Sequence, residues 1–388
     1  MVIGSDLMVK GFVYFSDNKI PFVIEGYRME LFSDEPILSD FCKENNYKDN
    51  YILYGQCLDN GFHGRNATFL VENSIGSTCY LRCYIVNMFD KDEEYDTIGV
   101  QSPFLDDVFR YQYNYIDMVR QGINFSLEPR EIYKIPFSMQ DKQYELSYYI
   151  GYNNKLGLLE DYDKKGEIMI PLHNKNIQEC LDISVVLNRL AMFMTSHSEV
   201  PFRRIILYSK EHKVGWFYCP LMSENAVARN DGFFYEFDVM KYIPKIIDNI
   251  ALDSGNKITK SIPLGHLCDY ESLLSPQRFI EQIMAFEYLF DKLEHIKAQN
   301  NRFSLKDELI YAFNWFPDLL SEAKESAETV SDNIKEIRRT ITHGYAYYYD
   351  FKSDSKAKYY ILLLDKLIKK MSLKWTGFSE TEVNNFLI

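Results

Sequence analysis

The sequence predicts an α+β protein in which a β-rich N-terminal region is followed by an all-α bundle. Up to about residue 172, short segments rich in β-branched and aromatic residues are separated by clusters of turn residues, as is typical of strands. From residue 275 onward, apolar residues recur at helical spacing instead. With 46% hydrophobic residues over 388 positions, the chain is long enough to bury two or three separate cores.

The predicted N-terminal strands are short, and turn sequences such as "DNK", "SDEP" and "ENSIGS" separate them. They cover residues 10–15, 22–32, 50–58, 67–72, 77–89, 125–137, 144–152 and 166–172. Consecutive short strands favour antiparallel pairing, so we expect a sandwich or a curved antiparallel sheet with a few helices. The pattern changes near residue 172, which leaves open a division of this region into two subdomains.

The pattern becomes mixed after residue 172. We expect, in chain order, a helix at 176–194, strands at 203–209 and 214–220, and a helix at 237–252. Asn188 interrupts the apolar stripe of the first helix, and Pro244 lies inside the second.

The polar segment "DSGNKITKSIPLG" at 253–265 contains glycine and proline, so we predict a domain boundary there. The N-terminal sensor or regulatory region then covers residues 1–262, and the helical domain covers residues 263–388.

Four amphipathic helices are predicted in the C-terminal domain, beginning at about residues 276, 305, 330 and 356. Ser275 followed by Pro276 is a typical helix start. Ser304 and Asp307 resemble a capping box at the start of the second helix. The third helix carries an apolar stripe of Val330, Ile334, Ile337 and Ile341. Short connections between such helices predict an antiparallel bundle.

The charge of the chain is strongly acidic overall but uneven. The net charge is −13 and the pI about 5.1, which argues against non-specific binding of nucleic acid. Residues 331–388 carry ten Lys and Arg against seven Asp and Glu, so this segment is +3 and the remainder −16. The basic segment therefore indicates where an anionic partner would bind.

The seven cysteines are odd in number and scattered, so we expect reduced thiols in a cytoplasmic protein. Cys79 and Cys83 are close, but no second pair completes a zinc site. The acidic run at 90–96 lacks the glycine and the terminal glutamate of an EF-hand, so we expect neither a metal nor a cofactor. The N-terminus lacks the apolar core of a signal peptide, and no apolar run approaches the ~20 residues of a membrane span.

The stretch "IKEIRRTITHG" at 334–344 contains the candidate catalytic residues. At ~100° per residue, Arg339 and His343 lie nearly opposite the apolar stripe and Arg338 on its flank. Gly344 is suited to the left-handed position that ends a helix. Basic residues at a helix C-terminus also interact favourably with the helix dipole. The stretch is therefore open to two interpretations, an ordinary solvated helix end or a catalytic pair.

The second interpretation gains from a resemblance to the HEPN superfamily of four-helix bundles, whose ribonuclease members carry Arg-x4-6-His in the third main helix. Arg338 and His343 match this motif, and Tyr345 extends it to the Arg-x4-His-x-Tyr form of some HEPN toxins. Glu287 lies where many members carry an acid on the first helix. The β-rich region followed by the bundle looks like the ApeA-type anti-phage HEPN proteins over essentially the whole chain. In active members Asn, Asp or His usually follows the motif arginine, whereas here Arg339 does. Either Arg339 replaces that residue as a phosphate ligand, or the Arg–His pair is tuned differently.

The resemblance implies a metal-independent endoribonuclease that acts in abortive infection and cleaves RNA, with tRNA as the expected substrate. It also implies a homodimer or higher homo-oligomer and a phage-derived trigger that acts on the N-terminal region. Arg338 and His343 would be catalytic, with Arg339, Tyr345 and Glu287 in support. Tyr345 could bind the phosphate or merely pack, and Glu287 could orient an arginine or be solvated.

Histidine suits the proton transfers of RNA cleavage, since it titrates near neutral pH, and arginine suits the phosphate because its planar fork is always charged. The alternative is a non-catalytic HEPN module that dimerises or binds a protein or nucleic acid.

Overall fold

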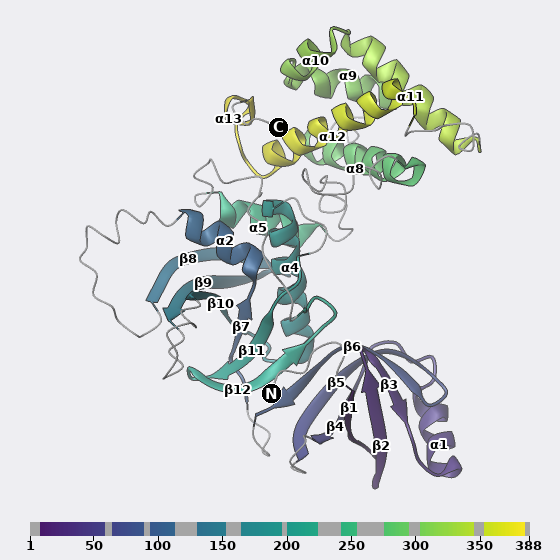
Figure 1. Ribbon diagram of the computed structural model, residues 1–388, viewed down its shortest axis with the longest axis vertical. Coiled ribbons are helices and arrows are strands. Elements are labelled where there is room, and N and C mark those ends of the chain that lie inside the picture. Colours follow the sequence, from purple (N-terminus) through teal and green to yellow (C-terminus); the bar gives the residue numbers. More distant parts are fainter. Residues whose placement is uncertain are drawn as a thin grey trace. The chain divides into compact units, whose positions relative to one another are not determined.

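The computed structural model describes residues 8–58, 64–88, 94–112, 130–152, 164–195, 200–223, 242–253, 275–294, 303–344 and 353–384 (Figure 1). The chain forms two compact units. The first consists of Met1–Phe137, Lys142–Asn188 and Val200–Asn230, and the second of Ser138–Asp141, Arg189–Glu199 and Asp231–Ile388. The first unit is built on strands and the second on helices, which confirms the predicted α+β class.

The first six strands close into an antiparallel barrel. They are β1 (Val9–Phe15), β2 (Asn18–Glu25), β3 (Arg28–Leu31), β4 (Tyr51–Leu58), β5 (Gly64–Ile75) and β6 (Thr78–Asn87). Their order is β3-β2-β1-β4-β5-β6, and β3 also pairs with β6, so the sheet meets itself. Helix α1 (Glu35–Asn45) joins β3 to β4 and lies beside the barrel in Figure 1. The predicted curved antiparallel sheet is thus confirmed, and it curves far enough to close on itself.

The barrel interior is filled by every second residue of each strand, including Val13, Ile20 and Phe22, which are almost fully buried. Closure brings the backbones of β1 and β4 very close at Gly11. A Cβ atom there would lie 1.9 Å from the carbonyl oxygen of Gln56, so only glycine fits.

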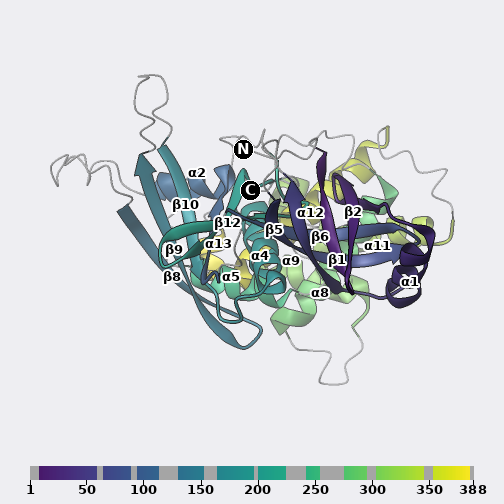
Figure 2. The same cartoon turned by 90° about the horizontal axis from the view of Figure 1, so that it is seen from below.

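Strand β6 continues the same sheet beyond the barrel. Residues Tyr84–Asn87 of β6 pair with β12 (His212–Tyr218), and the order continues β12-β11-β7-β10-β9-β8. The added strands are β7 (Thr97–Gln101), β8 (Arg130–Met139), β9 (Lys142–Tyr152), β10 (Lys164–Pro171) and β11 (Arg204–Ser209). Figure 2 shows β8, β9 and β10 side by side. Helix α2 (Pro103–Gln112) packs on this extension through Phe109, whose ring centroid is 4.9 Å from that of Tyr148.

The chain passes from β10 into helix α4 (Ile177–Thr195) at the place where the sequence changes pattern. The buried carboxylate of Glu179 accepts hydrogen bonds from the backbone N–H groups of His173, Asn174 and Lys175, and from the hydroxyl of Tyr144. These four donors fix the turn before the helix. Helix α4 is not broken at Asn188, whose side chain instead donates to the carbonyl of Val200 at 3.0 Å.

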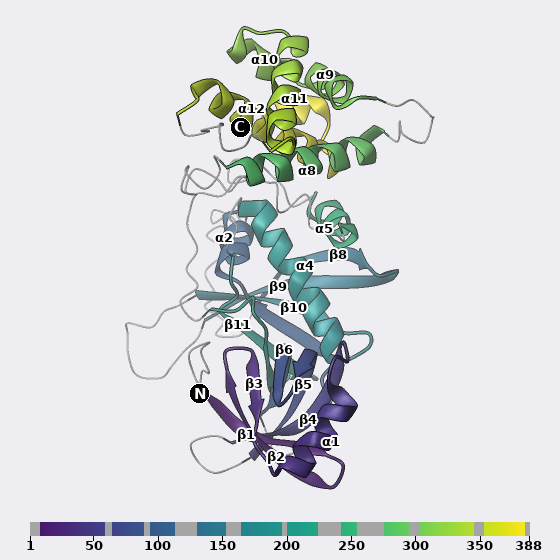
Figure 3. The same cartoon turned by 90° about the vertical axis from the view of Figure 1, so that its right-hand side faces the viewer.

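The second unit contains a helical bundle. Its helices are α8 (Pro276–Glu294), α9 (Leu305–Trp315), α10 (Asp318–Ala323), α11 (Ala327–Thr342), α12 (Ser355–Trp375) and α13 (Glu380–Asn384). Helix α8 packs against α12, and α9 packs against α11, which also contacts α8 and α12. In Figure 3, α8 lies below α9, α10 and α11. Helix α5 (Ile243–Leu252) joins this unit through Asn249, which donates to the carbonyl of Trp375 at 3.0 Å.

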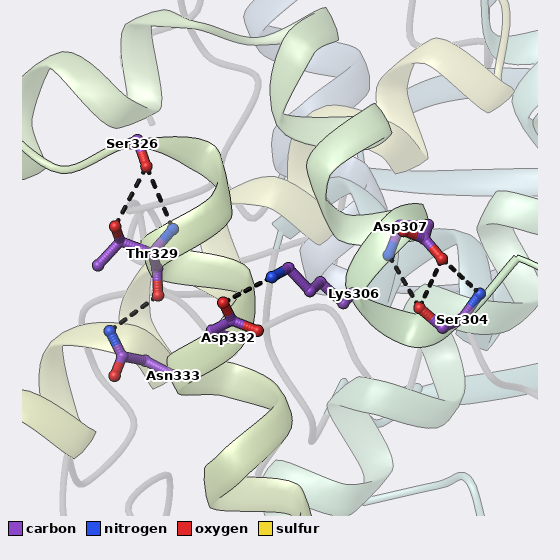
Figure 4. Close-up of polar contacts among 7 residues, drawn as sticks. All are labelled: Ser304, Lys306, Asp307, Ser326, Thr329, Asp332 and Asn333. Carbon is purple, nitrogen blue, oxygen red and sulfur yellow. Dashed lines mark hydrogen bonds and ion pairs between the residues drawn. The ribbon is translucent and has the colours of Figure 1, made fainter.

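Both predicted helix starts are confirmed. The backbone N–H of Arg278 donates to the Ser275 hydroxyl, and Ser304 and Asp307 form a reciprocal capping box (Figure 4). The helices α1, α2, α10 and α13 and the strand β7 were not predicted. The single strand predicted at 22–32 is wrong, because a turn at Gly26 (φ +62°) divides it between β2 and β3. The predicted boundary between 262 and 263 lies in 254–274, outside the described residues, and stays a prediction.

We predict that Gly11→Ala loosens the barrel, because the new methyl group must displace backbone atoms of β4. A cost of about 1–3 kcal/mol corresponds to amide hydrogen exchange about 5- to 150-fold faster in β1 and β4, measured by mass spectrometry. Gly64→Ala is the control, since its nearest neighbour is the flexible side-chain amide of Gln56. Equal exchange in Gly11→Ala and Gly64→Ala would contradict the close approach.

Candidate active site

Helix α11 carries the candidate site, and its two ends are well defined. It begins after Ser326, whose hydroxyl accepts a hydrogen bond from the backbone N–H of Thr329 (Figure 4). It ends at His343, whose backbone N–H donates to the carbonyl of Arg339 at 3.1 Å. Gly344 follows with φ +81°, the left-handed conformation that glycine adopts without strain. The chain therefore leaves the helix directly after the histidine.

The buried stripe of α11 sets the direction of the polar side chains. Val330, Ile334 and Ile337 are buried in the bundle. His343 is exposed, and the Arg339 side chain is 65% exposed, whereas that of Arg338 is 39% exposed. This matches the geometry expected from helical periodicity, with Arg339 and His343 facing outward and Arg338 on the flank.

The two arginines have different partners. Arg338 reaches across to α8, where its Nη1 lies 3.3 Å from Oε1 of Glu287, and both side chains are half-buried. Arg339 pairs with Glu336 one turn earlier on its own helix, with Nη2 2.6 Å from Oε1. The first pair joins two helices and therefore orients Arg338, while the second is a surface pair of the kind that contributes less than about 1 kcal/mol.

Tyr345, the remaining residue of the predicted site, lies outside the described residues. The structure thus brings Glu287 next to Arg338 and puts Arg339 and His343 on one exposed face of α11. Glu336 belongs to the same group but was not predicted, although its spacing of three residues from Arg339 is a usual signal for an ion pair on a helix.

Polar contacts hold α11 against its neighbours. The Asn333 amide donates to the hydroxyl of Tyr360 on α12 at 2.7 Å, and that hydroxyl donates to Glu325 at 2.7 Å. Lys306 of α9 lies 2.6 Å from Asp332 (Figure 4). Contacts to two different helices limit rotation of α11, so the exposed face keeps its direction.

A buried carboxyl group lies between α8 and α12. Asp365 of α12 accepts a hydrogen bond from the side-chain amide of Gln282 at 2.8 Å, and both residues are buried. Burial raises the pKa of the Asp365 carboxyl to about 7, although Lys369 and Arg278 act in the opposite direction. The sequence offered one signal for this site, an aspartate inside the apolar run "YYILLLDKLI".

Neither the cysteine pair nor the acidic run considered above forms a second site among the described residues, and residues 90–93 of that run lie outside them. Cys79 and Cys83 are buried on β6 as free thiols, and burial raises the pKa of Cys79 to about 11. The described residues contain no group of three or more His, Cys, Asp or Glu that could hold a metal ion. Among the helices of the described ranges, none is long and apolar enough to cross a membrane.

Compared with protein-family models, with curated proteins and with solved structures, the chain gives no match. Its function is therefore inferred from its own residues, their geometry and the sequence motif.

We predict that Asp365 makes the helical unit less stable as the pH rises from about 4 to about 7. Over that range the folded protein retains a proton that the unfolded chain, with an aspartate pKa near 4, has lost. The loss is on the order of a few kcal/mol and ends near pH 7, above which both states are ionised.

Thermal unfolding from about pH 4 to about pH 8 tests this, with Asp365→Asn for comparison. The Asn variant is expected to lose less stability than the natural protein over the lower part of this range. Parallel pH profiles for the two proteins would rule out a raised pKa at Asp365.

Proposed function

We propose that this chain is a HEPN-type endoribonuclease that acts in the cytoplasm in defence against phage. The observation that carries the proposal is the arrangement on α11. A guanidinium group anchored by Glu287 lies beside an exposed face that presents Arg339 and His343 at the end of the helix. The motif resemblance supplies the reaction, and the exposure of the imidazole makes it accessible to an RNA strand.

The chemistry needs few groups because RNA carries its own nucleophile. The 2′-oxygen attacks phosphorus while a base takes its proton, and the bond from phosphorus to the 5′-oxygen breaks while an acid protonates that oxygen. The products are a 2′,3′-cyclic phosphate and a 5′-hydroxyl, with no change in oxidation state. His343 serves in proton transfer, and fixed guanidinium charge stabilises the phosphorane.

The contacts of the two arginines support a division of labour. Arg339 is the more exposed and is held by a surface ion pair, so a phosphate can displace Glu336 at small cost. Arg338 is half-buried and bound to Glu287 on another helix, so a phosphate that approaches it meets a carboxylate. In the proposed enzyme Arg339 binds the phosphate, and Arg338 with Glu287 positions the end of α11.

One imidazole is not well suited to act as base and acid in the same step. A second copy of the chain, related by a two-fold axis, would supply the other, since such an interface brings the same patch together twice. The enzyme is therefore proposed to be a homodimer, with tRNA as the substrate and a phage-derived trigger that acts on the N-terminal region.

We predict that His343→Ala lowers RNA cleavage by at least about 100-fold, the usual contribution of a general acid or base. Purified protein is incubated with total RNA, with and without lysate from phage-infected cells, and 2′,3′-cyclic phosphate ends are counted. His212→Ala, which removes an exposed histidine on β12, is expected to behave as the natural protein. Equal cleavage by His343→Ala and the natural protein would remove the basis of the proposal.

The variant Glu287→Gln distinguishes a role of Glu287 in orienting Arg338 from a role in binding RNA. Without the carboxylate Arg338 is less well oriented, so we expect kcat/KM for RNA to fall about 10- to 100-fold. Affinity for a 2′-deoxy analogue that is not cleaved should stay the same or rise, because a negative charge has been removed. The control is Glu281→Gln on the same helix, which removes a pair with Arg278 that is also 3.3 Å long. A matching loss in the control would assign the effect to α8 rather than to Arg338.

A non-catalytic module is the second candidate. It is favoured by the two ion pairs, since Arg338 and Arg339 each have a carboxylate within 3.3 Å, which balances their charge. Such a module would leave total RNA intact under every condition, including in the presence of infected-cell lysate.

A further inference from the structure

The barrel carries an exposed apolar face that the proposed active site does not use. It is formed by the outward residues of three neighbouring strands and is named here the β1–β4 face. Its members are Lys19, Pro21 and Val23 of β2, Lys10, Phe12 and Tyr14 of β1, and Ile52, Tyr54, Gln56 and Leu58 of β4. Their neighbours along β1 and β4 point into the barrel and are buried, apart from Phe15 at the end of β1, so this face is a rigid surface.

The register makes the face continuous. Lys10 lies opposite Val23 on one side and Leu58 on the other. Phe12 lies between Pro21 and Gln56, and Tyr14 lies opposite Lys19. Directly opposed side chains in antiparallel strands are about 5 Å apart, so the apolar groups form one surface. Tyr54, on the outer strand β4 of this face, is 61% exposed, a high value for an aromatic side chain.

The β1–β4 face carries two lysines. Lys10 lies between Val23 and Leu58, and Lys19 Nζ lies 5.6 Å from the centre of the Tyr14 ring. Acids border the face: Asp17 lies in the turn before Lys19, Glu25 points to the same side of β2 as Val23, and Glu30 of β3, paired with Arg28, lies opposite Val23. Because the two lysines lie among the aromatic side chains, they can contact the phosphates of a polyanion.

Three aromatic rings among lysines match the chemistry by which barrels bind single-stranded nucleic acid. Bases stack on the rings, and the ammonium groups neutralise phosphates. The amide of Gln56, which donates to Asn66 of β5 at 3.1 Å, adds a polar group that can reach a base edge. Phe12, Tyr14 and Tyr54 come from two paired strands, so their separations are fixed before the ligand binds.

We infer that the β1–β4 face is a binding surface for single-stranded RNA. That the nucleic acid is RNA rather than DNA rests on the proposed function, whereas binding of a single strand rests on the face alone. The face would give the enzyme a second binding surface for its substrate, in addition to the proposed active site. RNA that is long enough to contact both surfaces at once would bind more tightly than short RNA that contacts only one.

The test uses the full chain with His343→Ala, so that cleavage does not interfere, and a fluorescent single-stranded oligoribonucleotide of about 12 nucleotides. Tyr14→Ala is expected to weaken binding about 5- to 150-fold, the effect of losing one stacked base. The matched control is Tyr80→Ala on β6. Tyr80 is as exposed as Tyr14, at 39%, but lies where β6 pairs with β3, away from the β1–β4 seam. Tyr54→Phe, which keeps the ring, should bind as the parent protein does.

The lysines give an independent readout. The double change Lys10→Gln and Lys19→Gln should make the slope of log Kd against log salt shallower by about 1.4, because two phosphate contacts are lost from a single strand. A DNA strand of the same sequence distinguishes a general single-strand surface from an RNA-specific one. Weaker binding of that strand supports the RNA assignment, and equal or tighter binding overturns it.

The inference fails if the oligonucleotide does not bind, or if Tyr14→Ala and Tyr80→Ala bind equally well. The latter result is also expected if the face serves an acidic protein partner instead. Failure of the nuclease proposal is a separate result, since a protein that never cleaves RNA can still lose affinity in Tyr14→Ala.

Discussion

The direction of every group at the candidate site depends on the packing of one narrow apolar stripe. Val330, Ile334 and Ile337 bury one side of α11, and this fixes the rotation of the helix about its own axis. A rotation by one residue, about 100°, would carry Arg339 to the flank or into the core. The contacts of Asp332 with Lys306 and of Asn333 with Tyr360 also oppose this rotation. The hydrophobic effect thus determines which charged groups face the solvent.

The site also shows an electrostatic compromise. A phosphate-binding surface needs positive charge, yet each arginine of α11 faces a carboxylate. The two pairs differ in kind, because the Glu287 pair is partly shielded from water and the Glu336 pair is not. Exposed pairs break easily, whereas partly buried ones persist. With both arginines paired in this way, the exposed face of α11 offers little uncompensated positive charge to a phosphate.

Local sequence signals predicted much of the helical unit, and non-local pairing explains most of what was missed. The caps at Ser275 and Ser304 and the stripe of α11 involve residues a few positions apart, so spacing revealed them. Closure of the barrel depends on pairing between β3 and β6, about fifty residues apart, which no local pattern encodes. The resemblance pointed to Glu287 but left open whether it orients an arginine or is solvated. The Gln282 partner of Asp365 could not be predicted because it depends on how α8 and α12 pack.

Strand β6 belongs to two structures at once. Its first residues, Thr78–Tyr80, close the barrel against β3, and its last residues, Tyr84–Asn87, begin the open extension by pairing with β12. A barrel cut from the chain after β6 would leave the second half of this strand with a bare hydrogen-bonding edge next to Ile85 and Val86. Edges of that kind join other chains and aggregate. The barrel is therefore not a detachable module, and the extension shields it from self-association.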